Sequence, residues 1–361
     1  MIPPPFPKLN PADLRALFTE AENRSGIRAL MVEKDAWVCW TLRQLFDLPD
    51  ARAHFIFKGG TSLSKVWKVI HRFSEDIDIS LSREWLGFTG QRDPEAAPSR
   101  KQRTKLLEEL SATCADKLQA DVLPALRTRF SESLGGAAGW GLTVASDDPQ
   151  TLLFAYPTVA NDGSGAAYVR PAVKIECGAR SDRWPMAEQS LTSYVAEAFP
   201  AAFPSSTFSV PVLDIERTFW EKATILHAEV HRPADKATPD RFSRHYADLA
   251  ALAVHTAGAA ALLRDDLRAR VVAHKQVFFP AAWAGYDTAV PGTFKLIPPP
   301  DRLGALAADY HAMQDMFFRR QPTWDELVAT LTALGARIND VSGYPKRGQT
   351  SLFALQADSE D

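Results

Sequence analysis

The sequence predicts an α/β (α+β) N-terminal half followed by a helical C-terminal half. "EDIDISL", residues 75–81, alternates polar and apolar side chains, as a half-buried strand does. "HFIFKGG", residues 54–60, is an apolar run that ends in a glycine pair, as at a strand-to-helix turn. From Asp214 onward, apolar residues recur at helical spacing.

The N-terminal half is expected to begin with helices between residues 11 and 49. Val38, Leu42 and Leu45 recur there at i, i+4 and i+7, which forms one apolar stripe. A loop is expected at 87–100, and the turn-rich "NDGSG" is expected to join two strands. The expected strands are 54–57, 75–81, 151–157, 167–178 and 207–213, and the further helices are 61–70 and 101–130.

The C-terminal half is expected to contain helices separated by one proline-rich break. We predict three regions: an α/β domain with N-terminal helices at 1–213, a helical domain at 214–345 that completes the active site, and a flexible tail at 346–361. The expected helices are 214–230, 240–257, 260–275, 302–318 and 323–339, with the break at 278–300.

Composition narrows the classes of function. The 361 residues carry a formal net charge of −3, so binding of a nucleic acid would need a local basic patch. The three cysteines are odd in number and widely spaced, which argues against a disulfide framework and a cysteine-rich zinc site. The start has prolines where a signal peptide would be apolar, and no apolar run is long enough for a membrane span. These features together favour a protein of the reducing cytoplasm.

Three carboxylates are candidate metal ligands. Asp76 and Asp78 are spaced i, i+2, which places both side chains on one face of a strand. A divalent cation commonly relieves the repulsion of such a pair, and a solvated strand face is the alternative. In "AVKIECG", Lys174 and Glu176 also share a face. Glu176 could complete a metal site from a neighbouring strand, or it could form a cross-strand ion pair.

The glycine pair is a candidate phosphate site. Gly59 and Gly60 follow a strand and open a helix, so that backbone N–H groups could approach a phosphate. An ordinary strand-to-helix turn is the alternative. The motif is not a P-loop, because Ser64 stands where that motif requires glycine.

A lysine lies on an apolar helix stripe in the C-terminal half. Lys222 follows Phe219 by three residues and precedes Leu226 by four. A lysine on a core-facing stripe must extend to solvent or find an anion, which could be a site carboxylate or a triphosphate. A structural salt bridge is the alternative. Glu221 and Arg217 are expected to point elsewhere.

A second polar line is expected on the next helix. Arg241, His245 and Asp248 recur at i, i+4 and i+7, which aligns a cation, an imidazole and a carboxylate. A solvated helix face is the alternative.

Together these motifs resemble a polymerase-beta-like nucleotidyltransferase fold. The sequence is similar over about residues 30–340 to the AbiEii/AbiGii toxin family, which includes the mycobacterial MenT enzymes. Many relatives have a serine at the second glycine position, whereas this chain has Gly60, and its nearest hydroxyls are Thr61, Ser62 and Ser64. The family motifs match at Gly59 and Gly60, Asp76 and Asp78, Lys174 and Glu176, Lys222, and Asp248.

The resemblance implies a nucleotidyltransferase toxin of a bacterial toxin–antitoxin pair. Such an enzyme would use Mg²⁺ or Mn²⁺, transfer a nucleotide from an NTP to the 3′ end of tRNA, release pyrophosphate and block translation. A separately encoded antitoxin protein would be its partner. The alternatives are a protein or small-molecule acceptor, phosphate transfer in place of nucleotide transfer, or an inactive binding partner.

The residues suggest roles within this mechanism. Asp76 and Asp78 would hold the metal, and Glu176 would bind one ion or act as the base. Lys222 would neutralise the β- and γ-phosphates, and Asp248 would orient Lys222 or the sugar. The residues assigned to the nucleotide or the acceptor are Gly59, Gly60, Thr61, Ser62, Lys174, Arg180, Arg241 and His245.

Overall fold

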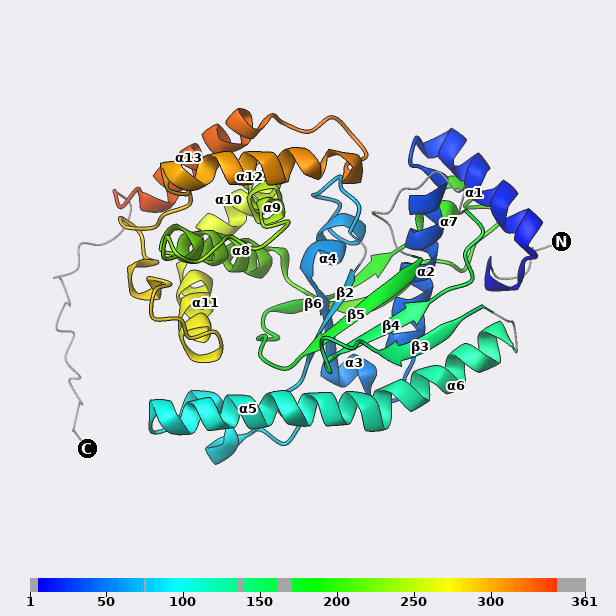
Figure 1. Ribbon diagram of the computed structural model, residues 1–361, viewed down its shortest axis with the longest axis horizontal. Helices are drawn as coiled ribbons and strands as arrows, with labels where there is room; N and C mark the ends of the chain where they lie inside the picture. The colour runs from blue at the N-terminus through cyan, green and yellow to red at the C-terminus, as the bar shows by residue number, and fades with distance from the viewer. Residues whose placement is uncertain (1–5, 75, 136–138, 161–170, 343–361) are drawn as a thin grey trace, which may run out of the picture.

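One mixed β-sheet lies at the centre of the computed structural model, with helices on both faces (Figure 1). The structure describes residues 6–342 apart from 75, 136–138 and 161–170. The α/β prediction for the N-terminal half is confirmed. Across the sheet the strands run β3 (Gly141–Val144), β4 (Thr151–Ala155), β5 (Ala172–Gly178), β2 (Asp76–Leu81), β1 (Phe55–Lys58), β7 (Phe208–Leu213) and β6 (Met186–Leu191).

The two faces of β2 differ in polarity, as the sequence predicts. Ile77 and Ile79 are fully buried, while Asp76 and Asp78 point to the opposite face and are only partly buried. β2 pairs in parallel with β5 and antiparallel with β1, and β1 pairs in parallel with β7. Because alternation continues along β5, the two central strands share one apolar and one polar face.

The apolar face packs against helices of the N-terminal half. Ile77 and Ile79 lie in one hydrophobic cluster with Val38, Leu42 and Leu45 of the predicted stripe. The expected long helix at 101–130 is interrupted by a π-helical turn, Leu118–Val122. The helices that supply this cluster are α1 (Pro11–Ser25), α2 (Ala29–Phe46), α5 (Arg100–Lys117) and α6 (Leu123–Leu134).

The polar face is approached by α4 (Gly59–Lys65) and by helices of the C-terminal half, which gather on one side of the sheet in Figure 1. A second hydrophobic cluster joins these helices and includes Leu63, Val69 and Ile70. Packing therefore crosses residue 213, and the division into domains there stays a prediction. The helices are α8 (Ile215–Val230), α9 (Ser243–Val254), α10 (Thr256–Leu262), α11 (Asp265–Phe278), α12 (Pro300–Ala312) and α13 (Trp324–Asn339).

Several element boundaries differ from the prediction. The helix expected at 61–70 begins at Gly59 and ends at Lys65, and the helix expected at 260–275 breaks between α10 and α11. The expected "NDGSG" turn, the first residues of the strand expected at 167–178, and the tail lie outside the described residues. The helix expected at 302–318 is divided into α12 and a 3₁₀ helix at Gln314–Met316. The sequence analysis missed β3, β6, α3 (Ala51–His54), α7 (Tyr194–Ala198), and 3₁₀ helices at Phe6–Lys8, Gly90–Arg92, Pro94–Ala96 and Tyr286–Thr288.

A short extended pairing joins the segment before β2 to the connection between α12 and α13. Arg72 and Phe317 form an antiparallel β-bridge. Beside it, the N–H of Phe73 donates to the carbonyl of Met316 at 2.7 Å, and the N–H of Phe318 donates to that of His71 at 2.9 Å. None of the helices within the described ranges is both long and apolar enough to cross a lipid bilayer.

Candidate active site

A pocket of about 260 Å³ lies between the polar face of β2 and β5 and the helices α8, α9 and α11. It brings together seven of the residues proposed from the sequence: Gly59, Gly60, Asp76, Asp78, Glu176, Lys222 and His245. The remaining lining residues are Lys58, Arg72, Ser74, Ser181, Thr218, Glu221, Ile225, Arg244, His274, Lys275 and Phe279.

Strand register places the carboxylates next to one another. Asp78 pairs with Glu176 across the parallel β2–β5 ladder, and Asp76 pairs with Lys174. Lys174 Nζ lies 2.6 Å from Glu176 Oε1, and both side chains are more than a third exposed. Glu176 therefore borders the pocket, and its ion pair is formed within β5 rather than across strands as the alternative expected.

The Asp78 carboxylate is in an unfavourable environment for a charge. Burial raises the pKa of Asp78, Lys58 opposes this change, and Glu176 adds to it. A cation placed between the carboxylates would relieve both the burial cost and the repulsion. The donor set of Asp76 and Asp78 suits Mg²⁺, which takes one or two carboxylates and completes its shell with phosphates and water.

A three-ligand metal cluster is not preassembled. Within the described residues, no group of three or more histidine, cysteine, aspartate or glutamate side chains converges closely enough to hold a metal ion. One oxygen of Glu176 is occupied by Lys174. Glu176 as a metal ligand therefore stays a prediction.

The glycine pair packs closely against side chains of the site. Gly59 has a φ of +78°, and a Cβ atom there would lie 1.9 Å from Asp78 Oδ2. At Gly60 a Cβ atom would lie 2.8 Å from Arg72 Nη2. A side chain at Gly59 would strain the backbone and displace the Asp78 carboxylate.

A buried ion triad stands behind the pocket. Arg72 Nε and Nη2 donate to the two carboxylate oxygens of Asp248 at 2.8 and 2.9 Å. Lys222 Nζ donates to Asp248 Oδ2 at 2.8 Å. Burial disfavours the charged carboxylate, but Arg72 and Lys222 outweigh it and hold the pKa of Asp248 well below its usual range. Asp248 is fully buried, so it positions the two cations and does not line the pocket.

His245 completes the surroundings of Lys222. Its Nδ1 lies 2.9 Å from Lys222 Nζ. Burial and the adjacent Lys222 ammonium lower the pKa of His245 well below its usual value. The ring is therefore neutral, and Nδ1 accepts a hydrogen bond from the ammonium.

The neighbouring residues of α8 correct one expectation. Glu221 was expected to point away from the site, but it lines the pocket because α11 packs beside α8 and encloses that side. Arg217 is fully buried, and its Nε lies 3.1 Å from Glu221 Oε1. Burial works against ionisation, yet Lys275 and Arg217 hold the pKa of Glu221 below its usual value.

Five residues proposed to contact nucleotide or acceptor are not among the lining residues of the pocket: Thr61, Ser62, Lys174, Arg180 and Arg241. Thr61 and Ser62 are fully buried, and the Ser62 hydroxyl donates to the carbonyl of Gly59 at 2.8 Å. Arg241 is exposed and precedes α9 with a φ of 57°, so it does not share the helix face of His245.

The sequence analysis missed several charged residues of the site. The pairing of Arg72 with Asp248 could not be predicted, because the two residues lie 176 positions apart in the chain. Arg244 of α9 lines the pocket, whereas Arg241, three residues earlier, does not. The missed charged or titratable residues are Lys58, Arg72, Glu221, Arg244, His274 and Lys275.

A comparison with protein-family models agrees with the sequence motifs. The family model described as "Nucleotidyl transferase AbiEii toxin, Type IV TA system" matches residues 40–330, a range that contains every residue of the pocket. No curated protein sequence matches the chain. Among solved structures, the chain is similar to MenT4, a nucleotidyltransferase toxin from Mycobacterium tuberculosis, with 16% identity, a TM-score of 0.47, and coverage of 93% of this chain and 91% of that chain.

Proposed function

Because the chain belongs to the AbiEii family of nucleotidyl transferase toxins of type IV toxin–antitoxin systems, we propose that it transfers a nucleoside monophosphate from an NTP to the 3′ end of tRNA. An NTP substrate and an antitoxin partner follow from the family. The tRNA acceptor and the resulting block of translation are the further steps of the proposal.

The observation that carries the proposal is the charge arrangement of the pocket. Carboxylates of β2 and β5 line one wall, and Lys222, Arg244 and Lys275 face them from three helices. A triphosphate with its divalent cation carries both signs of charge and matches both walls. A purely anionic or purely cationic ligand would match only one.

Asp76 and Asp78 would hold the divalent cation, Mg²⁺ or Mn²⁺. When bound, the cation supplies charge stabilisation at the phosphate oxygens. Lys222 donates to the β- and γ-phosphates, with its ammonium held in place by Asp248 and His245. Gly59 and Gly60 line the pocket, and because they carry no side chains, their backbone would be within reach of the triphosphate.

The reaction is a displacement at the α-phosphorus of the NTP. The terminal ribose hydroxyl oxygen of the acceptor forms a bond to the α-phosphorus, and the bond to the bridging oxygen breaks. Pyrophosphate leaves, and Glu176 takes the hydroxyl proton. Lys174 holds the Glu176 carboxylate at the rim of the pocket, where an acceptor end can reach it.

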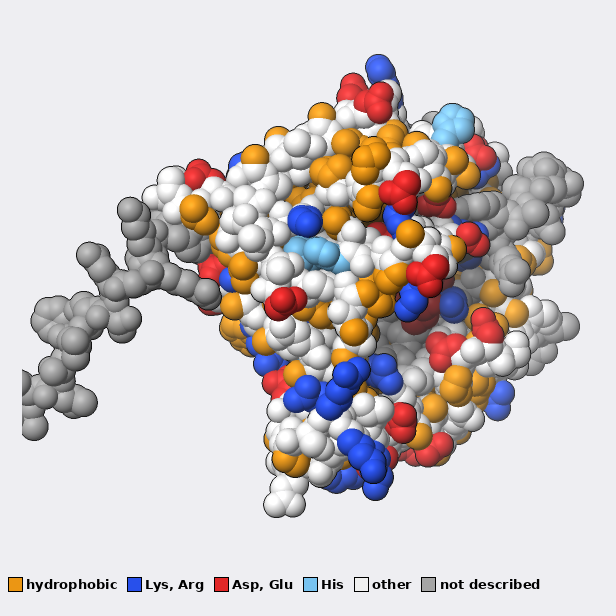
Figure 2. All heavy atoms as spheres, turned by 60° about the vertical axis from the view of Figure 1, so that its left-hand side comes forward, with side chains coloured by type: hydrophobic (Ala, Val, Ile, Leu, Met, Phe, Trp, Pro, Cys, Tyr) orange, Lys and Arg blue, Asp and Glu red, His pale blue; other side chains and the backbone are white. Residues whose placement is uncertain are grey.

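Binding of tRNA would depend on local basic surfaces, since the net charge is −3. On the face shown in Figure 2, Lys and Arg side chains gather in the lower part, whereas Asp and Glu side chains are more widely spread. Both substrates are cytoplasmic molecules, and the cytoplasm is the compartment that we propose for the enzyme.

The test is incubation of the purified protein with total bacterial tRNA, Mg²⁺ and each α-³²P NTP in turn, beside Asp78→Asn. We expect label on RNA with one preferred nucleotide, and loss of that label in the variant. Label on protein or on a small molecule would retain the site and overturn the tRNA acceptor. Transfer from γ-labelled but not α-labelled NTP would overturn nucleotide transfer.

A further inference from the structure

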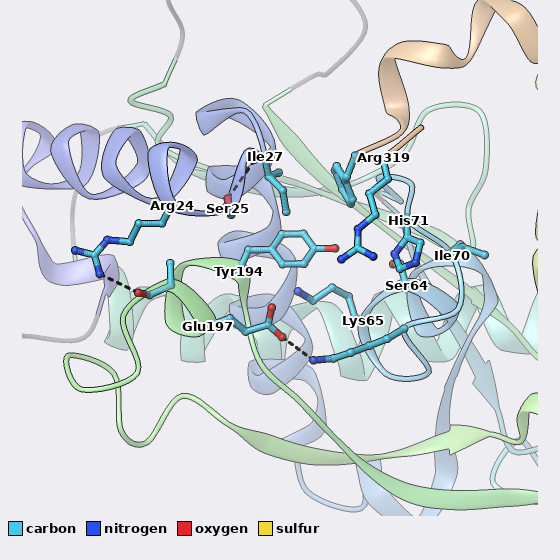
Figure 3. A pocket seen from close by; sticks show the side chains of 13 residues that line it. Arg24, Ser25, Ile27, Ser64, Lys65, Ile70, His71, Tyr194, Glu197 and Arg319 are labelled. Carbon is cyan, nitrogen blue, oxygen red and sulfur yellow. Dashed lines mark hydrogen bonds and ion pairs between the residues drawn. The ribbon is translucent and has the colours of Figure 1, made fainter. Parts of the chain in front are cut away.

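A second, larger pocket of about 420 Å³ lies at the other end of α4 (Figure 3). The active site adjoins the first residues of α4, Gly59 and Gly60, while the second pocket is lined by its last residues, Ser64 and Lys65. A helix of this length spans about 10 Å. The two pockets are therefore close but separate.

Basic residues outnumber acidic ones in the lining of the second pocket, although Arg24 pairs with Glu20 at 2.9 Å. The one acidic residue of that lining, Glu197, is paired with Lys68 at 3.0 Å. Lys65 is buried and lies 2.8 Å from Asp35, which belongs to α2 behind the pocket wall. The basic lining residues are Arg24, Lys65, Lys68, His71 and Arg319.

Arg319 is the unbalanced charge of this pocket. Within the described part of the chain, no carboxylate forms an ion pair with it, and its side chain is exposed to the pocket. It lies near His71, whose pKa is lowered by burial and by the Arg319 charge. An anion bound in this space would pair with the Arg319 guanidinium, which has no carboxylate partner within the described residues.

Hydrogen-bond donors converge on the same space. In Figure 3 the Tyr194 hydroxyl, the Arg319 guanidinium and the His71 ring point toward one another. The Tyr194 ring is fixed from below by Lys65, whose Nζ lies 3.4 Å from the ring centroid, and the Tyr194 N–H donates to Asp35 Oδ2 at 2.6 Å. A phosphate group, with several acceptor oxygens, matches a guanidinium and a hydroxyl held in this way.

Chain geometry relates this pocket to the active site. His71 and Arg72 are consecutive residues of the extended segment that pairs with Phe317, so their side chains point to opposite sides. His71 lines the second pocket and Arg72 lines the active site. A strand of several nucleotides is long enough to reach from one end of α4 to the other, whereas a single nucleotide fills one pocket.

We propose that the second pocket binds a backbone phosphate of the RNA acceptor while the reacting 3′ end occupies the active site. This inference rests on the proposed function for its RNA. An RNA strand and a free nucleotide would both be recognised through a phosphate. We favour RNA, because the two pockets lie at the two ends of one short helix. Arg319 supplies the principal cation, and Tyr194 and His71 supply further donors.

The experiment compares Arg319→Ala with Arg320→Ala, a matched control that removes an adjacent exposed arginine outside both pockets. Binding of fluorescently labelled tRNA is measured by anisotropy from 50 to 200 mM salt, and kinetics are measured with α-³²P NTP. For Arg319→Ala we expect about tenfold weaker tRNA binding, a salt slope reduced by about one, and an unchanged KM for NTP. Arg320→Ala should resemble the wild type.

Tyr194→Phe provides a second variant that keeps the ring and removes only the hydroxyl. A severalfold rise in the KM for tRNA is expected, with kcat and the KM for NTP unchanged. Binding of inorganic phosphate and of ATP is measured for the same variants, to distinguish an RNA phosphate from the phosphate of a free ligand. Weaker binding of ATP in Arg319→Ala, with unchanged tRNA binding, would overturn the RNA assignment in favour of a free nucleotide.

The failures of the two proposals can be told apart. If the wild type labels tRNA but Arg319→Ala has the same tRNA affinity and salt slope, the second pocket is not an RNA site and the proposed function stands. If the wild type labels no RNA, the acceptor is wrong. Loss of antitoxin protection in Arg319→Ala, with unchanged tRNA binding, would overturn the proposal and assign the pocket to an acidic protein segment.

Discussion

Arg72 and Asp248 lie 176 residues apart in the sequence, yet the Arg72 guanidinium donates to both carboxylate oxygens of Asp248 at 2.8 and 2.9 Å. Both side chains are buried. The pair fixes α9 against the segment that precedes β2, and Lys222 of α8 binds the same carboxylate. The position of the proposed triphosphate-binding lysine therefore depends on contacts between the two halves of the chain.

Replacement of Asp248 by asparagine should destabilise the fold. It leaves Arg72 and Lys222 as buried cations without a charged partner, which should cost about 3 kcal/mol of unfolding free energy. Urea unfolding at pH 7 measures this difference. A conformationally stable variant with the same unfolding midpoint would show that the triad contributes no net stability.

The effect of Asp248→Asn on the unfolding free energy should depend on pH. The folded pKa of Asp248 lies below the unfolded value of about 3.9, so its ionised form stabilises the fold above that pH. That stability is lost as the pH falls below about 4 toward the folded pKa. The stability difference between wild type and Asp248→Asn should therefore shrink below pH 4, by up to about 1.4 kcal/mol per pH unit. A difference that is constant from pH 6 to pH 3 would contradict the assignment.

Substitution of Gly59 by alanine should abolish activity at a modest cost in stability. The new Cβ would lie 1.9 Å from Asp78 Oδ2 and would displace that carboxylate. Gly87 is a matched control, because its φ is also +78° but a Cβ atom there would be 3.6 Å from its nearest neighbour, Arg92 Nη1. Both variants should lose about 1 kcal/mol from left-handed strain. Equal activities would show that the contact with Asp78 is dispensable.

Asp78→Ala should lower the rate of nucleotide transfer by about a thousandfold, which corresponds to about 4 kcal/mol of transition-state stabilisation. The variant removes one of the two β2 carboxylates that are proposed to hold the cation. Single-turnover kinetics with labelled NTP measure the rate, and circular dichroism checks the fold. A folded variant with wild-type turnover would remove Asp78 from the mechanism.

Lys222→Met should raise the KM for NTP about tenfold and lower kcat, because it removes an ammonium that faces the pocket. It should destabilise the protein less than Asp248→Asn does, since Asp248 keeps its two hydrogen bonds from Arg72. Calorimetric titration of NTP and urea unfolding separate the two effects. Wild-type NTP affinity and rate would make Lys222 a structural lysine.

Local patterns predicted the strands that carry the site. The alternation along 75–81 and 172–178 correctly placed the isoleucines in the core and the carboxylates on the opposite face. The edge strand β6 was missed because its residues are largely exposed and polar, which weakens the apolar signal. β3 is only four residues long and has one buried residue.

Contacts between distant segments were not predictable from local patterns. Periodicity identified Lys222 as a lysine in need of an anion, but it could not select Asp248 as that anion or reveal Arg72 as a second cation. Glu221 was assigned to the wrong side because α11 encloses part of α8 that a two-layer packing would expose. Contacts of this kind depend on how the helices pack against one another, and they leave no periodic pattern in the sequence.

The pairing of the segment 71–73 with Met316–Phe318 fixes which side chains point to each side of this extended segment. Each residue added to or removed from the paired segment turns the following side chains over. A single-residue insertion between His71 and Phe73 would send a different side chain toward each pocket, and the Arg72 contact with Asp248 would be lost. Relatives that keep both pockets should therefore differ in length within this segment by an even number of residues, or not at all.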